Sequence, residues 1–330
     1  MSKLAICIPT FNRCEVIKDT FGYQLDICRK LKIDIYLYDS SSDGKTAEYA
    51  KTLEAYENLY YIPIDSITTL DEKVVMLFQT YGRKKRYDYF WLAGDGVSFS
   101  EGLLYRVLTT LQEEPTVVVI NNEEAMPVDD KKYDNAQEAF KELFWKTILW
   151  GGVIIREDIY AGVDWNIYKK LFVGTDQISV GLHWYRLATL SEFHGVLLHG
   201  QRGIDIRKST VKKLAWWKEK DCGSETTYRV WAKGLSSVAG SLPFEETVIR
   251  QVLLDCKQHM QIFSWLSLCR SRKDRVYNLA IYRKYREGIQ LMSGHSYIGL
   301  FVVAVTPVLL MKIYVRIRDI FGNKLKERIA

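Results

Sequence analysis

A short stretch decides the fold of this chain: YDYFWLAGDGVSF, residues 87–99. Its aromatic and apolar part, 87–93, is typical of a strand that is buried on both faces. The run ends on Asp95, a single carboxylate between two glycines. A Gly-Asp-Gly segment can be no more than a turn. Alternatively, Asp95 is held at the end of the strand to meet something charged.

Strands and helices alternate along the first third of the chain. Apolar runs predict strands, and helical spacing predicts helices between them. The strands are expected at 4–10, 33–44, 59–64, 87–93 and 116–121, and the helices at 14–31, 45–56, 70–82 and 100–112. This alternation predicts βαβ units and a mainly parallel sheet. Ligands of such sheets bind beyond the carboxyl ends of the strands, where Asp39 and Asp95 both stand.

The pattern changes after about residue 122. A polar loop leading into an amphipathic helix is expected at 129–150, with further strands at 151–158 and 187–200. Beyond residue 210 the sequence is mostly helical in pattern. We therefore predict an α/β domain over residues 1–210 and a helical region over residues 211–330.

Composition sets limits on the class of protein. The 330 residues are 48% hydrophobic and 26% charged, with a net charge of +6, as in an ordinary globular protein. Six cysteines without a C-x-x-C pair indicate a reducing compartment. The first residues are unlike a signal peptide, because Pro9 stops a short apolar run. A cytoplasmic protein is expected.

The C-terminal region suggests a membrane surface. An apolar run at 296–311 precedes Lys312, Arg316 and Arg318, and residues 270–286 are strongly basic. A spanning helix needs about twenty apolar residues. This run is shorter and contains Pro307, so segment 296–318 is predicted to enter one leaflet, peripherally, on the cytoplasmic face. A buried C-terminal helix and a solvated basic face are the alternatives. Nucleic acid is not expected as a partner, because no recognised binding motif accompanies the basic residues.

Three strand-end motifs carry a family resemblance. AICIPTFNR (5–13), DIYLYDSSSDGKT (34–46) and DYFWLAGDG (88–96) resemble, in this order, the motifs of inverting family 2 glycosyltransferases with the GT-A fold. The resemblance covers roughly the first two hundred residues. It implies a Rossmann-like, mainly parallel sheet flanked by helices, followed here by a helical appendage. It also implies a hexosyltransferase-type enzyme that uses a nucleotide-diphosphate sugar, with UDP the expected nucleotide.

The resemblance also assigns the nucleotide-binding residues. In the family the first loop wraps the nucleotide, and an acid after the second strand accepts hydrogen bonds from the base. A basic residue is often found beside the sugar nucleotide. The expected residues here are Pro9, Thr10, Phe11, Asn12, Arg13, Asp39, Ser41, Lys73 and Asp95. The serine run after Asp39 lacks the Asn and the first Gly of the family turn.

The family signature at the fourth strand is Asp-x-Asp, which holds Mn²⁺ or Mg²⁺ and the ribose. Only Asp95 is present here, between Gly94 and Gly96. The resemblance therefore implies a metal held by Asp95 with a ligand from elsewhere, for which His199 is the candidate; a structural histidine is the alternative. Weak metal affinity, or stabilisation of the leaving group by cations, would follow. Arg202 and Arg207 are further candidates to face the diphosphate.

An inverting enzyme needs a general base for the acceptor hydroxyl. The family supplies an acid late in the domain, and Asp176 in VGTDQIS fits that position. Helix capping by Thr175 or Asp176 is the alternative. Trp145, Trp150, Gly151 and Gly152 resemble the stretch that shapes the acceptor site, although core packing would equally explain the tryptophans.

The first loop does not match two other classes of nucleotide-binding protein. A Rossmann dehydrogenase needs Gly-x-Gly-x-x-Gly after its first strand, and this chain has PTFNRC there. A sugar nucleotidyltransferase would need a glycine-rich, basic first loop. A catalytically degenerate GT-A protein that acts as a binding or scaffold subunit stays open. For an active enzyme, the expected acceptor is a glycan on a polyprenyl-diphosphate lipid, in capsule, other polysaccharide or glycoconjugate synthesis.

Overall fold

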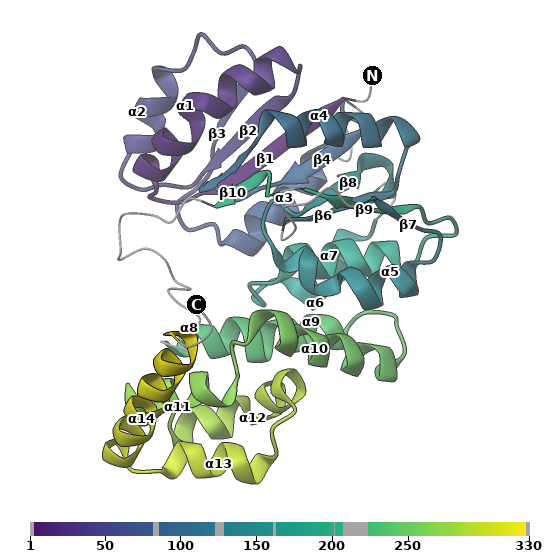
Figure 1. Ribbon diagram of the computed structural model, residues 1–330. Coiled ribbons are helices and arrows are strands. Elements are labelled where there is room, and N and C mark those ends of the chain that lie inside the picture. The colour runs from purple at the N-terminus through teal and green to yellow at the C-terminus, as the bar shows by residue number, and fades with distance from the viewer. Residues whose placement is uncertain are drawn as a thin grey trace. The chain divides into compact units, whose positions relative to one another are not determined.

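The computed structural model describes residues 3–81, 86–122, 129–160, 163–200, 202–206 and 224–327. These residues form two compact units (Figure 1). The first unit holds the described residues up to 206 together with Ser241–Phe244. The second unit holds residues 224–240 and the described chain from Glu245 onward.

An eight-stranded sheet organises the first unit, in the order β3-β2-β1-β4-β8-β6-β9-β7. Figure 1 shows helices on both of its faces. The strands are β1 Leu4–Thr10, β2 Asp34–Asp39, β3 Leu59–Pro63, β4 Tyr89–Leu92, β6 Val117–Asn121, β7 Lys131–Tyr133, β8 Val153–Arg156 and β9 Gly195–His199. A separate two-stranded sheet joins β5, Val97–Phe99, to β10, Ile204–Ile206.

The sheet is mixed but mainly parallel, as the sequence predicts. β1 pairs in parallel with both β2 and β4, and β2 pairs in parallel with β3. β8 runs antiparallel to its neighbours β4 and β6, and β7 is an antiparallel edge strand beside β9. The register places Thr10 opposite Asp39, so the carboxyl ends of β1 and β2 coincide.

Seven α-helices belong to the described part of the first unit. They are α1 Cys14–Lys30, α2 Lys45–Lys51, α3 Leu70–Tyr81, α4 Glu101–Thr110, α5 Ala136–Leu143, α6 Trp165–Phe172 and α7 Ile178–Leu187. Side chains from α1 and α4 meet the apolar face of the central strands, where Phe21, Leu104 and Trp91 are fully buried. This continuous apolar layer fixes the strand ends relative to one another.

Several boundaries differ from the sequence prediction. The strand within the stretch 33–44 ends at Asp39, as expected, but the strand expected at 187–200 is limited to Gly195–His199, and Leu187 is the last residue of α7. β7 was not predicted. It is an edge strand with two exposed lysines, so its sequence resembles that of a polar loop.

The turn after β4 is held from two sides. Thr20 of α1 donates a hydrogen bond to the carbonyl of Asp95 (3.1 Å). On the other side, Trp91 Nε1 donates to the carbonyl of Gly151 (2.8 Å). Gly151 has a φ of +92°, and a Cβ there would lie 2.9 Å from Val97 Cγ1. Only glycine fits this position without strain, so the turn that carries Asp95 is fixed by its packing.

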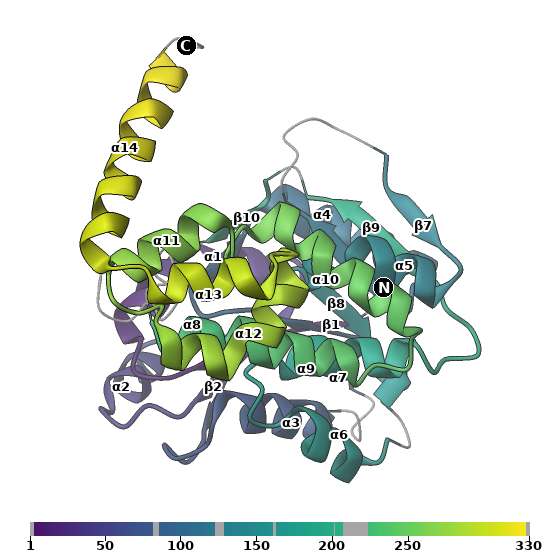
Figure 2. The same cartoon turned by 90° about the horizontal axis from the view of Figure 1, so that it is seen from below.

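The second unit is helical. Its elements are α8 Glu225–Thr227, a π-helix Tyr228–Leu235, α9 Ser236–Gly240, α10 Glu246–Met260, α11 Trp265–Lys273, α12 Leu279–Ser293, α13 Tyr297–Val305 and α14 Val308–Glu327 (Figure 2). The π-helix and α12 approach very closely. A Cβ added to Gly288 would lie 1.6 Å from the carbonyl oxygen of Ala232, so this contact requires glycine.

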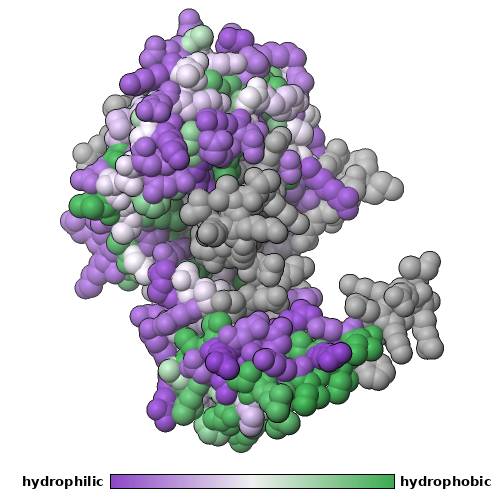
Figure 3. Space-filling model, turned by 90° about the vertical axis from the view of Figure 1, so that its left-hand side faces the viewer, coloured by the Kyte–Doolittle hydropathy of each residue, from purple (hydrophilic) through white to green (hydrophobic). Residues whose placement is uncertain are grey.

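Helices α13 and α14 expose apolar side chains. In the part of the chain that the structure describes, no single helix is long and apolar enough to cross a membrane. α13 and Val308–Ile320 of α14 meet that criterion only as a pair, bent by 108°. Figure 3 shows apolar side chains gathered on one side of the second unit. The exposed ones on these two helices are Tyr297, Ile298, Phe301, Val302, Val305, Leu309, Leu310, Ile313, Ile317 and Ile320.

The described cysteines are buried thiols. Cys7, Cys14 and Cys28 lie in the first unit and Cys256 and Cys269 in the second. Burial raises the pKa of Cys28 to about 11, so this thiol stays protonated at neutral pH. Cys222 lies outside the described residues.

Candidate active site

Asp95 is buried and paired with an arginine. Its Oδ1 lies 2.9 Å from Nη1 of Arg13, and its Oδ2 accepts a hydrogen bond from Oγ1 of Thr10 (2.9 Å). Burial raises the pKa of Asp95, while the guanidinium of Arg13 and the hydroxyl of Thr10 act to lower it. The first loop and the turn after β4 thus meet through charge, and Asp95 is more than a turn residue.

A second cation lies beside this pair. Lys73 of α3 is buried, and its Nζ donates to the carbonyl of Thr10 (2.9 Å) and to Oγ of Ser40 (2.7 Å). Burial lowers the pKa of Lys73, and the carboxylates of Asp39 and Asp95 oppose this. Two cations and one carboxylate therefore surround Thr10, an arrangement that favours an anionic ligand.

Asp39 lies at the end of β2 with both oxygens engaged. Oδ1 accepts from the backbone N–H of Ser41 (2.8 Å), and Oδ2 accepts from the hydroxyl of Tyr61 in β3 (2.8 Å). Burial and then Asp39 raise the pKa of Tyr61, so its hydroxyl stays a donor. An ionised carboxylate has about four acceptor sites, so Asp39 can still accept from a ligand. The sequence does not predict this contact of Tyr61, because Tyr61 resembles any other aromatic residue of a strand.

The serines that follow Asp39 contact the first loop. The backbone N–H of Asn12 donates to Oγ of Ser41 (2.7 Å), and the N–H of Ser42 donates to Oδ1 of Asn12 (3.0 Å). Asn12 has a φ of +52°, which asparagine tolerates better than most residues. These bonds join the first loop to the end of β2. Pro9 is buried within β1 opposite Tyr38, whereas the ring of Phe11 is exposed, 5.9 Å from Nζ of Lys73.

The segment expected to shape the acceptor site packs against the Asp95 turn. The N–H of Gly151 donates to the carbonyl of Leu92 (3.0 Å). A Cβ on Gly94 would lie 3.7 Å from Cβ of Trp150. Gly152 accepts from the N–H of Ile120 (2.8 Å), so this segment is fixed to two strands. Trp145 lies in the preceding 3₁₀ helix, with Nζ of Lys146 4.0 Å from its ring centre.

Asp176 lies in the short loop between α6 and α7. It has a φ of +57°, and its N–H donates to Oδ2 of Asp71 (3.0 Å). The N-cap of α7 is Gln177, and its own side chain makes no capping bond. Thr175 Oγ1 accepts from the N–H of Gln177 (3.2 Å), so capping by Thr175, rather than Asp176, has a counterpart in the structure.

His199 stands at the same edge of the sheet but on another strand. Two strands, β8 and β6, separate β9 from β4, which places their axes about 14 Å apart. The N–H of His199 donates to Oδ1 of Asp130 (2.9 Å). Among the described residues there is no group of three or more His, Cys, Asp or Glu that could hold a metal ion. With Asp95 paired to Arg13 and Thr10, the donor set does not fit a resident divalent cation.

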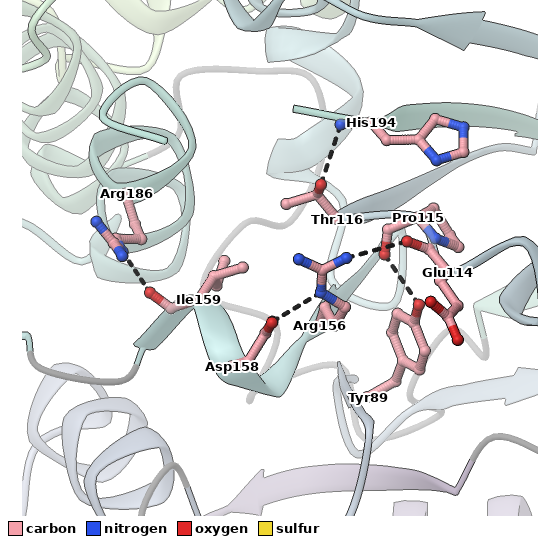
Figure 4. A network of polar contacts seen from close by, with 9 residues as sticks. All are labelled: Tyr89, Glu114, Pro115, Thr116, Arg156, Asp158, Ile159, Arg186 and His194. Carbon is pink, nitrogen blue, oxygen red and sulfur yellow. Dashed lines mark hydrogen bonds and ion pairs between the residues drawn. The ribbon is translucent and has the colours of Figure 1, made fainter. Parts of the chain in front are cut away.

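His194 lies at the opposite edge, before β9 begins. Its N–H donates to Oγ1 of Thr116 (3.0 Å), within the polar network of Figure 4. In the same network Arg156 binds Asp158 (2.7 Å) and the carbonyl of Glu114 (3.1 Å). These contacts lie where β6 and β9 begin and β8 ends, at the edge of the sheet opposite Asp39 and Asp95. Arg202 is exposed with a φ of +57°, and Arg207 lies outside the described residues.

Comparison with known proteins supports the fold by structure alone. No protein-family model matches the sequence, and no curated protein matches it significantly. Residues 1–349 of TarS from S. aureus, in complex with UDP-GlcNAc, share the fold with a TM-score of 0.57 at 12% identity. The alignment covers 88% of this chain and 81% of that chain.

Two further TarS structures match similarly. Another crystal structure of residues 1–349 gives a TM-score of 0.52 at 11% identity, over 88% of this chain and 83% of that chain. A longer TarS chain gives 0.53 at 11% identity, and this chain spans 50% of it. TarS has a GT-A glycosyltransferase fold. The expected GT-A fold is therefore confirmed for this chain.

Proposed function

We propose that this chain is an inverting glycosyltransferase that transfers a hexose from a nucleotide-diphosphate sugar, UDP-linked, to a hydroxyl of a glycan acceptor. One observation carries the proposal. At the carboxyl ends of β1, β2 and β4 of a GT-A fold, Arg13, Thr10 and Lys73 gather around Asp95 and the residues next to Asp39. This is the edge where sheets of this kind bind their ligands.

The donor would lie across the first loop. The exposed ring of Phe11 offers a flat surface for a base, and Asp39 can accept from the N–H of uracil. Ser41, which holds both Asp39 and Asn12, keeps that carboxylate and the loop in register. The diphosphate would then face Arg13 and Lys73.

These two cations would stabilise the leaving group. As the bond between the anomeric carbon and the diphosphate oxygen breaks, negative charge grows on the diphosphate. Arg13 is held by Asp95 and Lys73 by Thr10 and Ser40, so both are oriented before the donor arrives. Because the described residues around Asp95 do not fit a divalent cation, no step here depends on Mn²⁺ or Mg²⁺ at Asp95 and His199.

Asp176 would act as the general base. The acceptor hydroxyl oxygen attacks the anomeric carbon on the face opposite the diphosphate, and its proton passes to the carboxylate of Asp176. One carbon–oxygen bond forms as another breaks, which inverts the anomeric configuration and releases the nucleoside diphosphate. Trp150, Gly151 and Gly152 border the Asp95 turn and would line the acceptor side.

The second unit supports an acceptor carried on a lipid. Residues 265–330 contain thirteen Lys or Arg and four Asp or Glu, a balance of +9. The exposed apolar side chains of α13 and α14 lie in this same stretch. Apolar and basic side chains together suit the surface of an anionic membrane. We therefore place the enzyme peripherally on the cytoplasmic face, where it would extend a glycan on a polyprenyl diphosphate.

Asp176→Asn tests the proposal. The amide cannot take a proton, so we expect kcat to fall about 10²- to 10⁴-fold while calorimetry gives an unchanged donor Kd. The matched control is Asp164→Asn, the same change at an exposed cap of α6, where asparagine serves equally well. NMR of the product should show inversion.

Three outcomes would revise the proposal. An Asp176→Asn protein with wild-type turnover would place the base elsewhere. Donor binding by the wild type without hydrolysis or transfer would favour the scaffold alternative. Absence of binding to any nucleotide sugar would reject both.

A further inference from the structure

Asp71 is a buried carboxylate without a role in the scheme above. It lies in the first turn of α3 and is only 3% exposed. Its Oδ2 accepts two backbone N–H groups, from Gly174 (2.7 Å) and from Asp176 (3.0 Å). Within the described chain its Oδ1 has no hydrogen-bond partner. Burying a carboxylate is costly, so one that is buried and only half satisfied needs an explanation.

The loop that Asp71 holds has an unfavourable backbone. Gly174 and Asp176 both have positive φ values, +87° and +57°. This conformation is unfavourable for a residue with a Cβ, such as Asp176. Thr175 lies between Gly174 and Asp176, and its N–H and hydroxyl both donate to the carbonyl of Phe172. The N–H groups of Gly174 and Asp176 go to Asp71 instead.

Helix α3 also carries Lys73, two residues further on. In an α-helix two residues differ by about 200° around the axis, so these side chains point to opposite sides. Lys73 reaches the ends of β1 and β2 through Thr10 and Ser40, while Asp71 reaches the Asp176 loop. α3 therefore lies between the donor side of the site and the proposed base and contacts both.

An ordinary helix start does not explain these contacts. Acidic residues are favourable in the first turn because of the helix dipole, but that effect requires neither burial nor a distant partner. The cap of α3 is already complete without Asp71. Thr69 and Glu72 exchange hydrogen bonds, with the N–H of Thr69 donating to Glu72 (2.8 Å) and the N–H of Glu72 to Thr69 (3.3 Å).

We infer that Asp71 is a positioning residue, which fixes the backbone of the Asp176 loop so that the base faces the donor bound beside Lys73. The inference rests on the proposed function, in which Asp176 takes the proton. Asp71 itself touches neither donor nor acceptor. Its effect should therefore appear in the chemical step and not in donor binding.

The test compares Asp71→Ala with Asp71→Asn in the full chain. Alanine removes the acceptor of both N–H groups, whereas the asparagine oxygen can occupy the place of Oδ2 and accept both. We expect Asp71→Ala to lower kcat about 10- to 100-fold with donor KM unchanged. Asp71→Asn should restore most of the turnover. Asn135→Ala is the matched control, because it also removes one acceptor of two N–H groups, at the start of α5.

Hydrogen–deuterium exchange of a peptide around residues 171–178 gives a second readout that needs no activity. Faster exchange in Asp71→Ala, and wild-type exchange in Asp71→Asn and Asn135→Ala, would support the inference. Unchanged exchange in Asp71→Ala, or an Asp71→Asn enzyme as slow as Asp71→Ala, would overturn it. If Asp71→Ala alters exchange but Asp176→Asn keeps full turnover, the contact stands as structural, and it is the assignment of the base that fails.

Discussion

The first unit buries charged side chains, whereas the second unit exposes apolar ones. In the first unit Lys73 and Asp95 are only 3% and 5% exposed. In the second, Ile298 is 78% exposed and Leu309 is 69% exposed, while basic residues such as Lys312 and Arg316 lie on the surface. Each arrangement is unfavourable for an isolated protein in water.

This difference between buried charges and exposed apolar side chains indicates which kind of ligand each unit is expected to bind. Buried charges persist when they are paired and hydrogen-bonded, and they then offer an anion a site that is already organised. Exposed apolar side chains persist when another surface covers them. We therefore expect the first unit to bind a small anionic ligand and the second unit to contact an extended apolar partner.

The largest effect is expected from Arg13→Ala. This change leaves Asp95 buried without its cation, and breaking a buried pair in this way costs about 3–5 kcal/mol. The control is Arg29→Ala, whose partner is Asp26 and whose pair is more than half exposed on both sides, so about 0–1 kcal/mol is expected. Urea denaturation of each variant measures the free energy of unfolding.

A double variant sharpens this prediction. Asp95→Asn removes the charge that Arg13→Ala leaves unpaired, so the two changes together should destabilise the protein less than Arg13→Ala does alone. If Arg13→Ala costs no more than Arg29→Ala, the pair behaves as an exposed one. The contrast between buried and surface charge would then fail.

The meeting of the first loop, Asp39 and Asp95 at one edge of the sheet could be predicted from the sequence, because these residues follow strands. Asp39 and Asp95 both end apolar runs, and parallel strands bring their carboxyl ends to one edge. The first loop was placed by its motif. The contacts of this loop could not be predicted, because the pairing of Arg13 with Asp95 depends on which side chain reaches a carboxylate more than eighty residues away.

The contacts of Asp71 and Tyr61 could not be predicted from the sequence. Asp71 has the residue type and position of any acid in a first helical turn, and its two partners lie 103 and 105 residues later. Tyr61 resembles any strand aromatic until its hydroxyl meets Asp39. No local pattern marks such contacts, because they arise only when distant segments pack together.

The exposed apolar side chains of α14 can be tested for membrane binding. Ile313 and Ile317 are exposed one turn apart, and replacing both with Asp should weaken binding to anionic vesicles by about 2 kcal/mol, or roughly thirtyfold. Ile167→Asp, at an exposed isoleucine of the first unit, is the control. Co-sedimentation with phosphatidylglycerol vesicles measures the binding. Added salt should weaken it without abolishing it, since apolar burial is not screened.

Two results would contradict the membrane assignment. Equal vesicle binding by the wild type and the double variant would show that α14 is not the contact. A wild type that ignores vesicles but dimerises with concentration, while the double variant stays monomeric, would assign the apolar side chains to a second copy of the chain.

The smallest effect concerns the pH dependence of stability at Asp71. Burial raises the pKa of this carboxyl to about 6, from 3.8, with smaller opposing effects of the backbone N–H groups. A raised pKa in the folded state means that the folded chain holds the proton more tightly than the unfolded chain does. The resulting stabilisation is complete below about pH 4 and is lost as the pH rises through about 6.

Asp71→Asn isolates this contribution, because asparagine does not titrate and other carboxyl groups act equally in both proteins. Between about pH 5 and about pH 7.5 the wild type should lose about 1 kcal/mol relative to the variant. Denaturation curves for both proteins at the two pH values measure the difference. A constant difference would mean that Asp71 ionises normally and is hydrated, and the first unit would then bury one charge fewer than its contacts indicate.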